Sequence, residues 1–167
     1  MRNSTASLSA NGASMKSQKV LDDAWIALSL MEKASNDEEL RVHWISSICL
    51  LRMIGHVLHK VDSKLSITHK AVIDKWWSEI NQSKPEPTIF WTFINETRNL
   101  VLKEYELNFI TYKCEWIDTD SEGNNDVIDN TIHITPDGHE LFDQLSDALL
   151  WWQAELSSIN RLAQKGT

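Results

Sequence analysis

The chain has 167 residues, which is enough for one domain that buries a core without a disulfide or a structural metal. Its 24 Asp and Glu outnumber 16 Lys and Arg, so the formal net charge is −8. A large non-specific nucleic-acid interface needs excess positive charge and is therefore not expected. Only 5 Gly and 3 Pro are present, fewer than a turn-rich β-sandwich or barrel usually contains, and this favours a helical protein.

The first 17 residues are rich in Ser and contain no apolar run of the kind that a signal peptide needs. We expect a disordered tail over residues 1–17 and a single domain over residues 18–167. No segment approaches the roughly 20 apolar residues of a membrane span, so no membrane contact is expected. Cys49 and Cys114 show no metal-binding or redox spacing, which predicts reduced thiols in the cytoplasm and no cofactor.

Apolar residues at helical spacing predict a first helix over residues 19–33 and a second, longer one over residues 37–61. The run 35–39 between them offers an N-cap and a capping-box glutamate. The second helix carries one continuous apolar stripe and should be central; the stripe comprises Leu40, Trp44, Ile48, Leu51, Ile54, Leu58 and Val61. Gly55 within it indicates close packing against a neighbouring helix, because an interior glycine costs about 1 kcal/mol relative to alanine.

A third helix is predicted over residues 68–80 and a fourth over residues 88–109, separated by Pro85 and Pro87. Alternating apolar and polar residues then predict a β-hairpin over residues 110–135. The last helix should run from residue 135 to residue 162, with Pro136 in its first turn. The expected fold is all-α, an up-and-down bundle of four to five helices with a small inserted β-hairpin.

The fourth predicted helix carries one arginine on an apolar face. At about 100° per residue, the residues that share the face of Arg98 are Trp91, Asn95, Leu102, Tyr105 and Phe109. An arginine in such a stripe needs an anion, a carbonyl or an interface when the stripe is covered. The alternative is a structural arginine paired with a carboxylate inside the bundle.

The segment Arg98-Asn99-x-x-x-Lys103-x-Tyr105 resembles the motif of the HEPN family, closest to its toxin–antitoxin version Arg-Asn-x-x-x-His-x-Tyr. The resemblance implies a small, usually dimeric helical bundle. It also implies a metal-independent endoribonuclease site, in which Arg and His of two protomers face each other. By this resemblance the catalytic candidates are Arg98, Asn99, Lys103 and Tyr105.

Lys103 stands where the family has His. A histidine accepts and donates a proton near neutral pH, whereas a lysine ordinarily stays protonated up to a pKa of about 10.4. The resemblance therefore implies an inactive or altered relative that acts through RNA or a protein partner.

A polar face on the second predicted helix is a further candidate. Arg52, His56 and His59 lie four and seven residues apart and so share one side, where they could bind an anion or a partner together with Trp91 and Asn95. The alternative is a solvated or interface stripe. No third ligand accompanies the two histidines, so no metal site is predicted here.

The acidic segment 118–129 matches part of an EF-hand calcium loop. The oxygen ligands of that weak candidate would be Asp118, Asp120, Glu122, Asp126 and Asp129. Residue 125 is Asn instead of an apolar residue, and the flanks are predicted strands, so the preferred interpretation is an acidic hairpin tip. Residues 115–130 contain six acids and no Lys or Arg.

Two functions follow from the sequence. The first is a HEPN-like protein of a toxin–antitoxin or phage-defence setting, a homodimer that acts through RNA or partner binding. The second is a non-enzymatic acidic interaction or inhibitor protein, which dimerises and docks on a basic nucleic-acid-binding partner. Its 8 Trp suit the second role, since Trp is enriched among interface hot spots.

Overall fold

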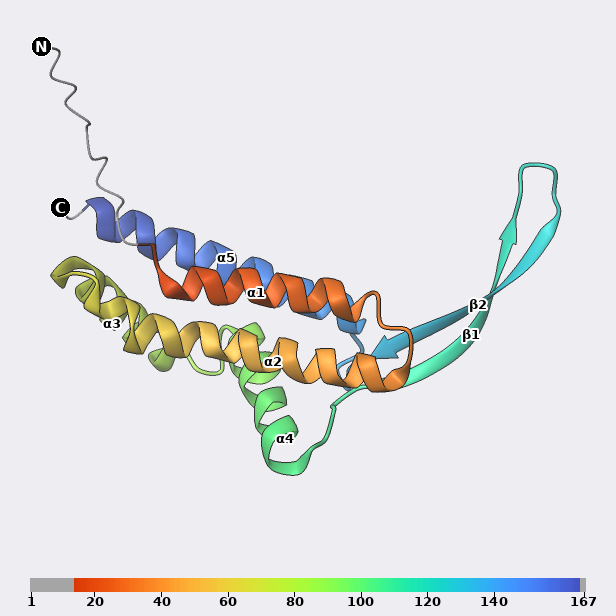
Figure 1. The fold of residues 1–167 in the computed structure, drawn as a ribbon, viewed down its shortest axis with the longest axis horizontal. Helices are drawn as coiled ribbons and strands as arrows, with labels where there is room; N and C mark the ends of the chain where they lie inside the picture. The colour runs from red at the N-terminus through yellow and green to blue at the C-terminus, as the bar shows by residue number, and fades with distance from the viewer. Residues whose placement is uncertain (1–13, 166–167) are drawn as a thin grey trace, which may run out of the picture.

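A computed structural model describes residues 14–165. They form a mostly helical fold with one antiparallel pair of strands, as predicted (Figure 1). The α-helices are α1 (Lys16–Met31), α2 (Asp37–Lys60), α3 (Ile67–Gln82), α4 (Thr97–Glu104) and α5 (Leu141–Lys165). Shorter pieces are the 3₁₀ turn η1 (Asp62–Lys64) and the π-helical segment η2 (Ile89–Glu96). The strands are β1 (Ile110–Thr119) and β2 (Asn125–Ile134). No helix in the described range has both the length and the apolar character of a membrane span.

The start of α2 confirms the predicted cap. The Asn36 side chain accepts a hydrogen bond from the Glu39 amide at 2.9 Å, and the Glu39 carboxylate accepts one from the Ser35 amide at 2.8 Å. Three acids in the first turn add favourable charge at the positive end of the helix dipole. The chain therefore reverses between α1 and α2 with the Ser35 and Glu39 amides satisfied by side chains.

The apolar stripe of α2 lies at the centre of the core, and all its predicted members except the half-exposed Val61 are buried. Gly55 meets α5 closely, as its position in the stripe indicates. A Cβ atom at Gly55 would lie 3.0 Å from Cη2 and 3.2 Å from Cζ2 of Trp152, which is itself fully buried. The absence of a side chain at Gly55 therefore leaves room for the Trp152 indole.

The first helix begins at Lys16, earlier than predicted, and this corrects the expected extent of the tail. Residues 14–17 belong to the folded domain: Met15 and Ser17 are buried. Residues 1–13 of the predicted tail lie outside the described residues. The early start has a tertiary cause, because the buried Asp62 in η1 accepts hydrogen bonds from the Lys16 and Ser17 amides, each at 2.9 Å.

The fourth predicted helix is the largest departure from expectation. Instead of one α-helix over residues 88–109, η2 is π-helical and α4 ends at Glu104, where Tyr105 adopts a left-handed conformation with φ of 57°. The last helix begins at Leu141, six residues later than predicted. Residues 135–138 form a turn closed by the Gly138 amide on the Thr135 carbonyl, and φ is 86° at Gly138.

The hairpin begins at Ile110 as predicted, ends at Ile134, one residue before the predicted bound, and extends from one end of the bundle (Figure 1). Its register pairs Ile110 with Ile134 and Thr119 with Asn125. Only its base packs on the bundle, where the buried His133 ring lies 5.6 Å from the ring of Phe109 and 6.0 Å from that of Phe142. Most of the hairpin is therefore exposed to solvent.

Replacing Asp62 with alanine should lower the free energy of unfolding by about 1–3 kcal/mol, because two helix-terminal amides lose their acceptor in a buried place. Urea denaturation measures the change. Asp62→Asn, which keeps an acceptor oxygen, should lose less. Asp74→Ala removes an exposed partner of Lys70 and should stay within about 0.5 kcal/mol of the parent. Equal losses for Asp62→Ala and Asp74→Ala would contradict the capping role.

Gly55→Val should destabilise the fold by about 1–3 kcal/mol, because the added atoms overlap a buried ring that has no free volume to enter. Gly138→Val tests the alternative that any glycine matters equally, since nothing lies within 4 Å of its Cβ position and only its backbone conformation is strained. Near-ultraviolet circular dichroism of the tryptophans should change for Gly55→Val alone. An unchanged aromatic spectrum would contradict the close approach.

Candidate functional site

Three predicted site residues meet in one hollow between α2 and α4. Arg52 and His56 come from α2, and Arg98 comes from α4. The hollow has a volume of about 390 Å³, and its remaining lining residues are Cys49, Met53 and Leu102. We call these six residues the arginine groove.

Helical spacing explains how the groove is built. On α2 its members lie at positions 49, 52, 53 and 56, the spacing of one helix face, while 98 and 102 are one turn apart on α4. Cys49 and Met53 were not predicted as site residues. The same spacing could have found them, because Cys49 lies one turn before Arg52 and Met53 lies one turn before His56.

The two arginines make polar contacts only with neutral groups among residues 14–165. Arg52 donates from Nε to Oδ1 of Asn95 at 3.3 Å, and Arg98 donates from Nη1 to Oδ1 of Asn99 at 2.9 Å. The Arg52 guanidinium also lies 5.7 Å from the centroid of the Phe90 ring. Within the described range neither arginine has a carboxylate within 4.0 Å, so Arg98 is not the ion-paired structural arginine of the alternative reading.

Two positively charged side chains, Arg52 and Arg98, lie close together in the groove. Burial and the nearby positive charge of Arg98 both lower the pKa of Arg52 from its ordinary value. Burial raises the pKa of the Cys49 thiol, and the charge of Arg98 partly opposes that rise. Two guanidinium groups that share a partly desolvated place without a counter-charge form a site for an anion, which they can bind in a bidentate manner.

Three of the four predicted catalytic residues, Asn99, Lys103 and Tyr105, do not line the groove, although Asn99 accepts a hydrogen bond from Arg98. Lys103 and Tyr105 are exposed, and Tyr105 at 66% exposure marks the end of α4. The motif placed Lys103 five residues after Arg98, which on a regular α-helix such as α4 is about 140° away around the axis, so the two side chains face different directions. Tyr105 was expected to share the face of Arg98 on an α-helix that runs through residue 109, but α4 stops at residue 104.

His59 and Trp91 lie apart from the arginine groove, in the aromatic cluster around Trp77. The rings of His59 and Trp77 are 5.7 Å apart, and those of Trp77 and Trp91 are 6.4 Å apart. Trp91 donates from Nε1 to the Ile80 carbonyl at 3.2 Å, and Nζ of Lys84 lies 3.8 Å from its ring centroid. These residues hold η2 against α3 and are not placed to bind the same anion as Arg98.

The acidic segment is a hairpin tip, and its carboxylates are spread along two strands. Asp118 lies opposite Asp126, and Asp129 lies opposite Glu115. Asp120 accepts hydrogen bonds from the Asn124 side chain and from the backbone amides of Asn124 and Glu122 within the turn, and these bonds lower its pKa. No group of three or more His, Cys, Asp or Glu within residues 14–165 could hold a metal ion, so the geometry does not support the EF-hand alternative.

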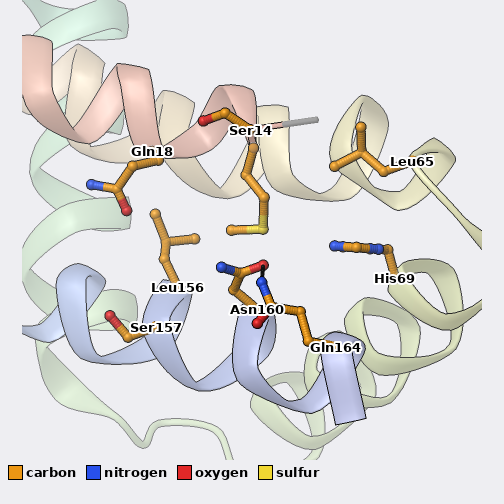
Figure 2. Close-up of a pocket in the computed structure, with 9 residues that line it drawn as sticks. Ser14, Gln18, Leu65, His69, Leu156, Ser157, Asn160 and Gln164 are labelled. Carbon is orange, nitrogen blue, oxygen red and sulfur yellow. Dashed lines mark hydrogen bonds between the residues drawn. The ribbon is translucent and has the colours of Figure 1, made fainter. Parts of the chain in front are cut away.

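A second hollow lies at the far end of the bundle, between α1, α3 and α5 (Figure 2). Its volume is about 340 Å³, and its polar lining includes Gln18, His69, Asn160 and Gln164 but no charged side chain. His69 Nδ1 and the Ser66 hydroxyl are 2.8 Å apart in a hydrogen bond. Sequence patterns gave no signal for this pocket, since its residues come from three separate segments.

Comparisons with protein-family models, with curated proteins and with solved structures found no match.

The reactivity of Cys49 tests the electrostatics of the arginine groove. In a Cys114→Ser background, alkylation by iodoacetamide should follow a pH profile whose midpoint lies above that of free cysteine. Arg98→Met should move the midpoint to still higher pH, because it removes the charge that favours the thiolate. Arg98→Lys keeps a positive charge and should fall between the two. A pH profile that is the same in the parent and in Arg98→Met would show that Cys49 and Arg98 do not interact.

Proposed function

We propose that the protein is a HEPN-like helical protein of a toxin–antitoxin or phage-defence setting. In this role it binds RNA through the arginine groove and does not cleave it. The observation that carries the proposal is the pair of arginines, Arg52 and Arg98, which share one hollow with no carboxylate within 4.0 Å among residues 14–165. A protein of this type acts in the cytoplasm.

An RNA phosphate suits the groove by charge and by shape. Its oxygens can accept from both guanidinium groups, and charge-assisted hydrogen bonds of this kind are about twice as strong as neutral ones. His56 and Met53 are exposed at the rim, where an unstacked base can pack on an imidazole or an apolar side chain. The negative charge of the whole chain limits the contact to a short stretch of RNA, because only a local basic site favours it.

The proposal includes a homodimer with two arginine grooves facing each other. Apolar side chains at the rim are exposed, with Leu102 at 54% and Met53 at 46%. A second copy placed over this rim would cover them and would bring four arginines to one cleft. Such a cleft needs a polyanion to offset its charge, which links dimer formation to RNA binding.

The absence of cleavage in this proposal rests on the proton-transfer groups. Lys103 occupies the motif position of the histidine, and its side chain does not line the groove of its own chain. In the HEPN motif the histidine transfers the proton, and this chain has no histidine at that position; His56, the histidine of the groove, comes from α2 and lies exposed at the rim.

Fluorescence anisotropy with a labelled single-stranded RNA tests the proposal. Arg52→Met and Arg98→Met should each weaken binding by about tenfold and reduce the dependence on salt by about one phosphate contact. The matched control is Arg161→Met on α5, which removes the same charge from an exposed position away from the groove. It should change the affinity by less than about twofold.

The same samples, incubated with RNA without metal, should show no cleavage. An equal loss of affinity for Arg161→Met would show that only the total charge of the chain matters and that the arginine groove is not the RNA-binding site. RNA cleavage that disappears in Arg98→Met would overturn the non-catalytic part of the proposal and keep the binding part.

A further inference from the structure

The hairpin of residues 110–134 presents two different faces, which the strand register defines. We call this segment the hairpin arm. One face carries six large apolar side chains in cross-strand pairs, the apolar face, made up of Ile110, Tyr112, Trp116, Ile128, Ile132 and Ile134. On the other face the corresponding positions are mostly polar, apart from the pair of Ile117 and Val127.

The apolar face is unusually exposed for a sheet surface. Ile110 is 58%, Tyr112 53%, Trp116 56% and Ile128 49% exposed. Near the base of the arm it is His133, on the opposite face, that packs on the bundle; Ile132 and Ile134 are half-buried there, and the rest of the apolar face is open. Contiguous exposed apolar surface of this kind marks an interaction site.

The arm also has two open backbone edges. The sheet contains only β1 and β2, so within residues 14–165 each strand has one side without a strand partner. A two-stranded hairpin with one covered end is marginally stable in water, and a third strand on its edge supplies both backbone hydrogen bonds and cover for the apolar face.

Charge decides what kind of strand the arm accepts. Between residues 110 and 134 there are six carboxylates and one lysine. The register sets two like-charged pairs directly opposite each other: Glu115 with Asp129 on the face opposite the apolar face, and Asp118 with Asp126 at the outer end of the apolar face. Such pairs are destabilising in a free hairpin, and cationic side chains from a partner relieve them.

We propose that the hairpin arm docks a basic partner protein by adding an edge strand of alternating apolar and Lys or Arg residues. The apolar residues of that strand extend the apolar face beside Trp116, and its cations lie on the opposite face beside Glu115 and Asp129. A second copy of this arm is disfavoured, because it would bring six more carboxylates to the same edge. RNA is disfavoured for the same reason. The proposal does not depend on the arginine groove.

A ten-residue peptide that alternates valine and lysine is a direct probe of this surface, and a valine–glutamate peptide of the same length is its charge control. The full chain should bind the lysine peptide at least tenfold more tightly than the glutamate peptide, measured by anisotropy of the labelled peptide. Glu115→Gln with Asp129→Asn, on the face where the lysines of the added strand lie, should weaken binding and flatten its dependence on salt.

The register also provides a matched pair of variants. Trp116→Ser with Ile128→Ser removes one cross-strand pair from the apolar face and should weaken peptide binding by about tenfold or more. Ile117→Ser with Val127→Ser removes the neighbouring cross-strand pair from the opposite face, where exposure is even higher at 69% and 64%, and should weaken it by less than about threefold. Cross-strand contacts in nuclear magnetic resonance spectra show that the arm of each variant is still paired.

Several results would overturn the proposal: no binding of the lysine peptide by the full chain, equal binding of both peptides, or equal effects of the two variants. A dimer that dissociates only in the Trp116→Ser, Ile128→Ser variant, seen by light scattering, would assign the surface to a second copy instead. Both variants should keep the affinity for RNA, so failure at the arm and failure at the arginine groove are distinguishable.

Discussion

The close approach of Gly55 and Trp152 is the contact on which the helical body depends. It places α5 against α2 at a distance that no other residue at position 55 permits without movement of the ring. The Trp152 indole in turn packs near the rings of Trp76 at 5.8 Å, Phe90 at 5.8 Å and Trp151 at 4.7 Å. The Trp152 side chain of α5 therefore packs against residues of α2, α3 and η2.

The shape of the arginine groove depends on the aromatic rings that pack around Trp152. Phe90 lies in η2, and its ring contacts both Trp152 and the guanidinium of Arg52. The same η2 segment carries Asn95, which accepts from Arg52, and leads directly into α4 with Arg98. Displacement of the Trp152 ring would therefore move the support of Arg52, so the site and the core are parts of one packing arrangement.

Periodicity and capping chemistry predicted the fold well where local rules apply. The stripe of α2, the cap at Asn36 and the hairpin of residues 110–134 follow from patterns within one segment. The start of α1 did not, because it depends on Asp62, which is 46 residues away from Lys16 in the chain. The π-helical turn of η2 and the left-handed Tyr105 also had no local signal, and they changed which residues share a face with Arg98.

The candidate site was predictable to the same degree. Arg52 and His56 share a face by spacing alone, whereas their meeting with Arg98 needs the packing of α2 on α4. The HEPN motif selected Arg98 and Asn99, which do form a hydrogen bond, together with Lys103 and Tyr105, which lie outside the groove. A linear motif assumes regular geometry, and here the helix changes pitch before the motif and ends within it.

The Asp62 carboxylate has a consequence for how the molecule opens. A helix at the start of a domain ordinarily frays first, since its leading amides bond only to water. Here those of Lys16 and Ser17 are tied to the turn between α2 and α3. The Lys16 and Ser17 amides can therefore exchange their protons only when their bonds to that distant turn open, which couples the start of α1 to it.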